Sequence, residues 1–374
     1  MNLRDEYKLV VLLSKRDLDM VEEKELIKLL HMNLEWDKVL GIIEMHRVGG
    51  IGWLNLNKYF FNDNKNRCKF PRLYKFLKNS YSAQKLRAEE HLKYTSLVCL
   101  ALTENNISYV LLKGLSLSEY VYNDLGLRDF NDNDILVHPN DIEKAKNIIM
   151  NLGYEQGETK HYTKIIKSNR KEQLVRKLSS HEIIPLIRDV SGSEIFLTQH
   201  IIDLHFSVNL MTKERSNNIT TEFLSSSRSI TIKGNQIQIL NKENLLIFLT
   251  EHFYKEAISY RDVTMYKDLL LYKLCDIYYL INKNHIDWDY ILEFANKNNF
   301  EKQLYFALVY VQEAFNTATL TTIINKLDVR ENFFDDNVYY YDSSDIAFTY
   351  NSGSLIERMF DIDKPKRKVF SPQK

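Results

Sequence analysis

The segment SYVLLKGLSLSEYVYNDLGLRDFNDNDILVHPN, residues 108–140, decides the fold. Its two apolar runs, 108–113 and 133–137, have the length of buried strands. Between them, residues 115–122 have the spacing of a helix, and helical spacing returns at 141–152. The order strand, helix, strand, helix predicts an α/β unit in the middle of the chain.

More β-structure is expected downstream of this unit. Apolar runs at 181–187 and 201–208 are two further strand candidates. Residues 229–232 and 236–240 flank Lys233-Gly234-Asn235, which is a hairpin signal. The central part of the chain therefore predicts a sheet of several short strands.

A polar insert, at about 159–180, interrupts this central part. Its cationic residues are Lys160, Lys164, Lys167, Arg170, Lys171, Arg176 and Lys177. They suit contact with phosphates or an acidic acceptor. The acidic neighbours Glu158, Glu172 and Glu182 favour a solvated helix face instead.

Helical regions are expected on both sides of the sheet. The whole chain has only 11 Gly and 5 Pro, and long stretches without either favour helices. We predict an N-terminal helical region at 1–105, a catalytic core at 106–240, a C-terminal helical domain at 241–330 and a loosely packed polar tail at 331–374.

Composition narrows the class of protein. The 374 residues include 50 Lys and Arg and 50 Asp and Glu, so the net charge is zero and a nucleic-acid partner is not expected. The three cysteines are far apart and form no CxxC pair, which suits a reducing compartment. No apolar run approaches the ~20 residues of a membrane span, and the N-terminus lacks a secretory signal. A cytoplasmic protein without a membrane partner is expected.

Two aspartates open the second strand of the segment. Asp132 and Asp134 are separated by one residue, and residues at this spacing in a strand project to the same face. Paired carboxylates can hold divalent cations, and Mg²⁺ prefers such oxygen ligands. For a DxD pattern alone, a solvated acidic loop is the commoner interpretation.

Three further features favour a site over a solvated loop. Lys113-Gly114 ends the first strand and Ser116 opens the next helix, a turn in which backbone amides can approach a phosphate. Arg128 precedes the aspartates and can contact a triphosphate, although a surface ion pair would also explain it.

The third feature is a further carboxylate in an apolar strand. Asp203 and His205 share one face of the run at 201–208, where an unpaired charge is costly. Asp203 is thus a natural third ligand, with a charge at the strand edge as the alternative. For His205, a buried structural histidine is about as plausible as a site role.

These residues, in this order, resemble the nucleotidyltransferase superfamily. The resemblance is to the bacterial group of uncharacterised nucleotidyltransferases called family 5. It is carried by YVLLKG ending in Gly114, Leu127-Arg128, the strand at 132–137, Leu152-Gly153-Tyr154 and Asp203-Leu204-His205. It covers roughly residues 20–300.

The resemblance implies an α+β fold, with a short mixed sheet, flanking helices and a helical domain at each end. It implies that Asp132, Asp134 and Asp203 form a metal triad and that Gly114 and Ser116 face the nucleotide phosphates. Two positions depart from the family pattern. Asn133 replaces an apolar residue and needs a polar partner if buried, and Leu115 stands where the turn usually has serine.

The expected activity is transfer of a nucleotidyl group from a nucleoside triphosphate to an acceptor hydroxyl, with Mg²⁺ or Mn²⁺ as cofactor. Lys113 and Arg128 would neutralise the triphosphate, and His205 would orient Asp203 or touch the acceptor. The resemblance further suggests a peptide acceptor and a role in tailoring peptide natural products. Two alternatives stay open: sugar transfer from a nucleotide-sugar at the same metal site, and a module that binds a nucleotide or peptide without turnover.

Overall fold

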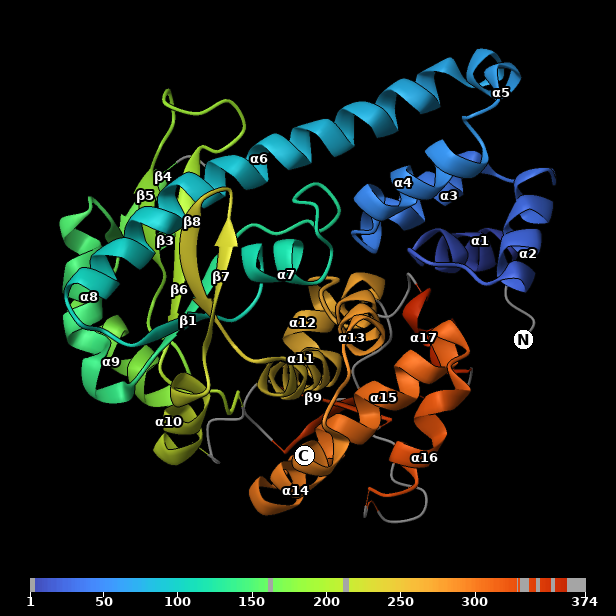
Figure 1. The fold of residues 1–374 in the computed structure, drawn as a ribbon. Coiled ribbons are helices and arrows are strands. Elements are labelled where there is room, and N and C mark those ends of the chain that lie inside the picture. The colour runs from blue at the N-terminus through green and yellow to red at the C-terminus, as the bar shows by residue number, and fades with distance from the viewer. Residues whose placement is uncertain are drawn as a thin grey trace. The chain divides into compact units, whose positions relative to one another are not determined.

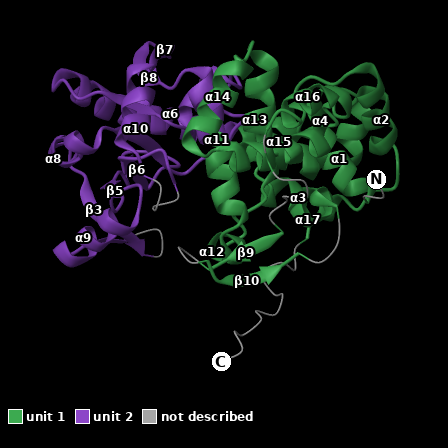
Figure 2. Cartoon of the chain, turned by 90° about the horizontal axis from the view of Figure 1, so that it is seen from below, with its two compact units in different colours: residues 1–81, 249–374 green, residues 82–248 purple. Residues whose placement is uncertain are grey.

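The computed structural model describes residues 4–160, 164–210, 215–327, 329, 336–340, 344–350 and 354–361. The chain forms two compact units, shown in different colours in Figure 2. Unit 1 comprises residues 1–81 and 249–374, and unit 2 comprises residues 82–248. The domain boundaries expected from the sequence remain predictions.

Unit 2 is built on one mixed sheet of eight strands in the order β4-β3-β5-β6-β2-β1-β8-β7. The strands are β1 (Tyr109–Leu111), β2 (Asn133–Val137), β3 (Glu155–Lys160), β4 (Lys164–Lys167), β5 (Leu186–Asp189), β6 (Gln199–His205), β7 (Arg228–Ile232) and β8 (Asn235–Ile239). β6 pairs with β2 and β1 with β8 in parallel, and the other neighbours are antiparallel. The α+β class is confirmed.

The expectation of a short sheet was wrong. The added strands β3 and β4 form a hairpin, and part of it comes from the segment expected to be a polar insert. Their side chains are largely exposed or half-buried, so the alternation of apolar residues that announces a half-buried strand is weak there. Helix α9 (Arg170–Ser179) follows them, with Asn169 capping its first turn and no buried residue.

The main core of unit 2 lies between one face of the sheet and two helices. These are α8 (Ile142–Asn151) and the part of α6 (Pro71–Glu104) that belongs to unit 2, both visible in Figure 1. Leu92 and Leu102 of α6 share this core with Ile135, Ile202 and Leu204 of the central strands. Because side chains alternate along a strand, the residues between these positions face the opposite side of the sheet.

Local sequence explains how the chain enters and leaves these elements. Gly114, with φ +67°, stands between β1 and α7 (Leu115–Tyr120), and the hairpin turn at Lys233-Gly234 also has positive φ. The helix expected from 141 begins at Ile142, after a short 3₁₀ turn. The side chain of Asp141 accepts no capping hydrogen bond from the backbone of this helix.

Unit 1 is helical. Its N-terminal helices are α1 (Asp5–Leu13), α2 (Met20–Leu30), α3 (Trp36–Met45), α4 (Gly49–Tyr59) and α5 (Asn64–Lys69). Its C-terminal helices are α12 (Tyr260–Thr264), α13 (Leu271–Lys283), α14 (Trp288–Asn298), α15 (Glu301–Phe315) and α16 (Thr321–Ile324). Helix α11 (Lys242–Ala257) crosses the boundary between the two units. Helix α10 (Asn217–Ser225) belongs to unit 2.

Buried polar contacts join the two sequence-distant halves of unit 1. The Nζ of Lys15 donates to the carbonyl of Phe315 at 3.4 Å. The backbone N–H of Leu271 donates to His46 Nδ1 at 3.1 Å. The N-terminal helices therefore fold together with helices encoded more than 200 residues later.

Parts of the expected tail belong to this unit. β9 (Asn337–Tyr339) pairs with β10 (Ile346–Thr349), and α17 (Leu355–Met359) begins with a capping box at Ser354. Phe348 and Ile356 are buried, so these stretches are packed rather than loose. The basic end at 364–368 lies outside the described residues.

No helix among the described residues is long and apolar enough to cross a membrane.

Gly157 in β3 provides a test of the hairpin packing. A Cβ at this position would lie 2.2 Å from the carbonyl oxygen of Ile166, so alanine must force the strands apart. Gly157→Ala should lower the free energy of unfolding by about 1–3 kcal/mol, as overpacking does. Chemical denaturation measures this. In the control Gly41→Ala, an exposed helical position with open space, stability should instead rise by about 0.5–1 kcal/mol.

Candidate active site

The parallel pairing of β2 with β6 brings two of the expected carboxylates together. Asp134 and Asp203 are direct register partners, so their side chains lie side by side on the face of the sheet opposite the main core. Asp132 directly precedes β2 and interacts electrostatically with both of them. The structure thus brings the three aspartates together, and their role as metal ligands stays a prediction.

The three carboxylates repel one another. Burial, followed by the negative charge of Asp134, raises the pKa of Asp132. Burial also raises the pKa of Asp203 well above its usual value, with further contributions from Glu182, Asp132 and Asp134. The Oδ1 of Asp203 is buried and has no hydrogen-bond partner among the described residues. A cation between these groups would relieve both costs.

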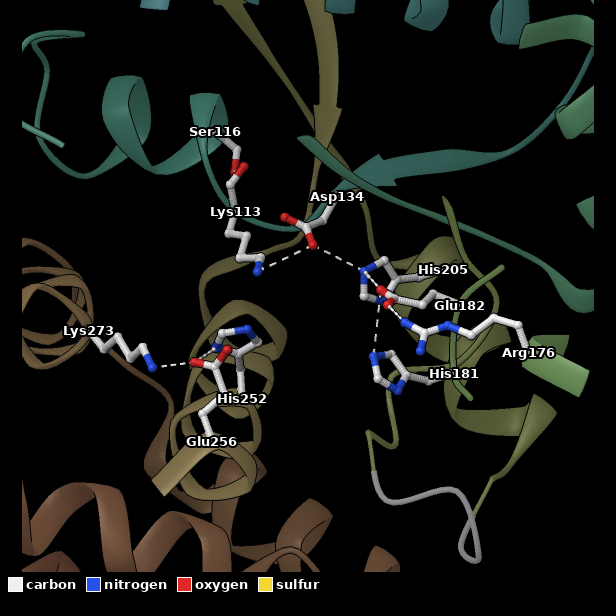
Figure 3. A network of polar contacts seen from close by, with 10 residues as sticks. All are labelled: Lys113, Ser116, Asp134, Arg176, His181, Glu182, His205, His252, Glu256 and Lys273. Carbon is white, nitrogen blue, oxygen red and sulfur yellow. Dashed lines mark hydrogen bonds and ion pairs between the residues drawn. The ribbon is translucent and has the colours of Figure 1, made fainter. Parts of the chain in front are cut away.

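Positive side chains offset part of this charge. Lys113, two residues after β1, lies with its Nζ 3.3 Å from Asp134 Oδ1, a contact drawn in Figure 3. The charges of Lys113 and of the buried Arg128 lower the pKa of Asp132 against the effects that raise it. Both cations expected from the sequence therefore act on the aspartates, and their contact with a triphosphate remains a prediction.

The turn after β1 holds Gly114 and Ser116 tightly. A Cβ at Gly114 would lie 3.3 Å from the carbonyl oxygen of Asp132, and the positive φ already disfavours other residues there. Ser116 is 1% exposed, and its hydroxyl donates to the Lys113 carbonyl at 3.2 Å. These contacts give both residues a structural role in the turn. Their contact with phosphate remains a prediction.

His205 connects Asp134 to an acidic residue that the sequence interpretation did not place in the site. His205 Nε2 lies 3.1 Å from Asp134 Oδ1 and 3.1 Å from Glu182 Oε2. Glu182 also forms an ion pair with Arg176, from the basic insert, and lies beside His181. Figure 3 shows this chain of contacts. The sequence placed Glu182 at the start of the strand expected at 181–187 and among the acidic neighbours of the basic insert, and neither place marked it as a site residue.

Asn133 has the polar partners that its position requires. It is fully buried and faces α6, on the opposite side of β2 from the aspartates. Its Nδ2 donates to His91 Nδ1 at 3.1 Å and to His200 Nε2 at 3.2 Å. Thr95 and Tyr154 complete the network with contacts of 3.0 and 2.8 Å to the two ring nitrogens of His200. This network fixes the strand segment that carries both aspartates.

Both histidines of this network are held neutral. Burial lowers the pKa of His200 to about 3. Burial, followed by the electrostatic effects of His200 and Arg87, lowers the pKa of His91 well below its usual value. A neutral His200 with its proton on Nδ1 can accept from Asn133 and Thr95 through Nε2. Asn133 therefore depends on imidazoles that stay unprotonated.

Unit 1 contains a separate polar cluster on α11 and α13. Lys273 forms an ion pair with Glu256, and His252 Nδ1 lies 3.5 Å from the same carboxylate. Lys273 also donates to the carbonyl of Asp268 at 2.9 Å. These contacts explain Lys273 as part of the packing of these helices.

A mixed sheet with clustered carboxylates on adjacent parallel strands fits the class that the sequence resembles. Residues 32–316 match the family described as "Uncharacterised nucleotidyltransferase", which is well over half of the chain. The chain belongs to this family, and the resemblance read from the sequence is confirmed.

Other comparisons add little. An antigenic nucleotidyltransferase-like protein from Paracoccidioides brasiliensis is similar in structure at 13% identity, over 66% of this chain and 97% of that one. Its TM-score is 0.35, and a likeness this weak carries no weight for the fold or the function. No curated protein matches the chain.

Because these histidines are neutral in the folded state, we expect the protein to lose stability as the pH falls. Because the pKa of His200 is about 3 in the folded state, against 6.5 ordinarily, the unfolded state binds more protons between these values. Stability from this group is complete above pH 6.5 and is lost as the pH falls. Relative to His200→Gln, the natural protein should lose about 2 kcal/mol of unfolding free energy between pH 7.5 and 5. Denaturation curves at both pH values measure this, and a constant difference between the proteins would contradict it.

Asp203 and Asp134 should have opposite effects on the free energy of unfolding of the metal-free protein. Asp203→Asn removes a repelled charge and should raise the free energy of unfolding by on the order of 1 kcal/mol. Asp134→Asn should lower it, because Lys113 and His205 lose a charged partner. Thermal melts in chelator at pH 7.5 compare the two variants. Glu158→Gln, an exposed carboxylate on β3, serves as the control and should change little. Equal shifts for the two aspartates would show that their environments do not differ.

Proposed function

We propose that this protein is a metal-dependent transferase that moves a nucleotidyl group from a nucleoside triphosphate to an acceptor hydroxyl. Membership of the nucleotidyltransferase family supports the general class. The observation that carries the finer proposal is the register of β2 with β6, which sets Asp134 beside Asp203 and next to Asp132.

The residues present fit a divalent cation. Three neighbouring carboxylates, two of them with a raised pKa and one with a buried oxygen that accepts no hydrogen bond from the described residues, are suited to Mg²⁺ or Mn²⁺. Asp132, Asp134 and Asp203 would hold the ion. When bound, it would supply positive charge to the phosphate oxygens of the donor.

The chain's own groups would do the remaining work. Lys113, beside Asp134, and Arg128, which acts on Asp132, would neutralise charge on the triphosphate. Asp203 would also accept the proton of the acceptor hydroxyl as general base, because it lies beside the other two aspartates. Gly114 and Ser116 would hold the turn that faces the phosphates. His205 would keep Asp134 oriented.

The proposal also includes a cellular location and an acceptor. Cys68, Cys99 and Cys275 are free, which suits a cytoplasmic location. A peptide acceptor stays a prediction from the resemblance. Transfer from a nucleotide-sugar and binding without turnover are the competing outcomes of the experiment below.

The decisive experiment measures donor binding and consumption. With Mg²⁺, the natural protein should bind a nucleoside triphosphate in calorimetry and raise its melting temperature by mass action. Asp132→Asn should weaken this binding at least tenfold, and Gly114→Val should weaken it through the displaced turn. Asp289→Asn, an exposed aspartate in α14, is the control and should bind as the natural protein does.

Product analysis separates the alternatives. Release of pyrophosphate from a nucleoside triphosphate supports nucleotidyl transfer, whereas release of a nucleoside diphosphate from a nucleotide-sugar supports glycosyl transfer. Metal-dependent binding with no consumption of either donor, in the presence of peptide and small-molecule hydroxyl acceptors, supports the binding module. If no donor binds with Mg²⁺ or Mn²⁺, the proposal is wrong.

A further inference from the structure

Two histidines and one glutamate converge beside the aspartates. The ligand atoms of His181, Glu182 and His205 all lie within 4.8 Å of one another. Glu182 Oε2 is 3.1 Å from His205 Nε2 and 3.7 Å from His181 Nε2. Ligand atoms about 2 Å from a tetrahedral metal stand about 3.3 Å apart. The cluster therefore has nearly the spacing of a metal site.

Backbone pairing fixes this spacing. Glu182 and His205 form an antiparallel bridge at the end of β6. On either side of it, the N–H of Ile183 donates to the backbone carbonyl of Leu204 at 3.1 Å, and the N–H of Phe206 donates to the backbone carbonyl of His181 at 3.0 Å. The backbone positions of all three residues are thus set by this pairing.

The two imidazoles are buried, and the carboxylate of Glu182 is oriented toward them. His181 and His205 are 5% and 2% exposed. Arg176 contacts Glu182 Oε1, which leaves Oε2 facing both imidazoles. An outer residue that orients a ligating carboxylate in this way is typical of metal sites. His205 Nδ1 is buried without a hydrogen-bond partner among the described residues, so Nε2 is the only ring nitrogen that faces polar groups there.

We propose that His181, Glu182 and His205 bind a transition-metal dication such as Zn²⁺, Mn²⁺ or Co²⁺. Imidazole nitrogens suit these ions, whereas Mg²⁺ prefers oxygen. The site is therefore chemically distinct from the three aspartates. It adjoins them through Asp134, whose Oδ1 lies 3.1 Å from His205 Nε2.

Cobalt absorption tests this site independently of nucleotide transfer. The full chain, stripped with chelator and dialysed against Co²⁺, should bind an ion with the strong visible bands of nitrogen-containing, low-coordinate Co²⁺. Oxygen-only octahedral Co²⁺ at the aspartates would absorb weakly. Addition of Zn²⁺ should remove the bands by displacement.

Variants assign the bands to residues. His181→Asn and Glu182→Gln should each weaken Co²⁺ binding at least tenfold, while Asp203→Asn and the control Glu158→Gln should keep the bands. Circular dichroism and melting confirm that each variant is folded, and if one ligand variant does not fold, the other decides. Absence of the bands in the natural protein, or bands unchanged in both ligand variants, would overturn the site. The readout uses no nucleotide, so failure of the transferase proposal would leave it unaffected.

Discussion

The parallel pairing of β2 with β6 is the constraint on which the site depends. These strands come from segments about 70 residues apart, and their register sets Asp134 opposite Asp203 and Leu136 opposite His205. A shift by one residue would turn every one of these side chains to the other face, into the apolar core. Burial of Ile135, Ile202 and Leu204 in that core therefore holds the charged groups on the other face.

The same strand is held from its other face by polar contacts. Asn133 lies between two aspartates but points away from them, to His91 and His200. Such a buried network stabilises the fold only while each of its polar groups has a hydrogen-bond partner. Here this requires neutral imidazoles. The residue that departs from the family pattern is thus explained by partners on α6 and β6, and it separates a neutral network from a charged site across a single strand.

Positive side chains compensate part of the negative charge on the face of the sheet that carries the aspartates. Lys113 and Arg128 act on the aspartates, and Arg176 acts on Glu182, yet the pKa values of Asp132 and Asp203 remain raised. The site is therefore left with negative charge that the described side chains do not neutralise. A fold optimised for stability alone would not retain it, since clustered carboxylates cost free energy when no cation is present. This residual charge is the physical link between the fold and the proposed cation binding.

The sequence by itself determined the main elements and the family. The apolar runs and their turn residues located β1, β2, β6 and the hairpin β7–β8, because these signals are local. It did not reveal β3 and β4, whose side chains are largely exposed, nor the packing of α17 against distant helices. It marked the three aspartates but not Glu182. Only the tertiary structure decided that Glu182 meets His205 and that Asn133 meets two histidines, because these contacts depend on strand register and on segments that are remote in the chain.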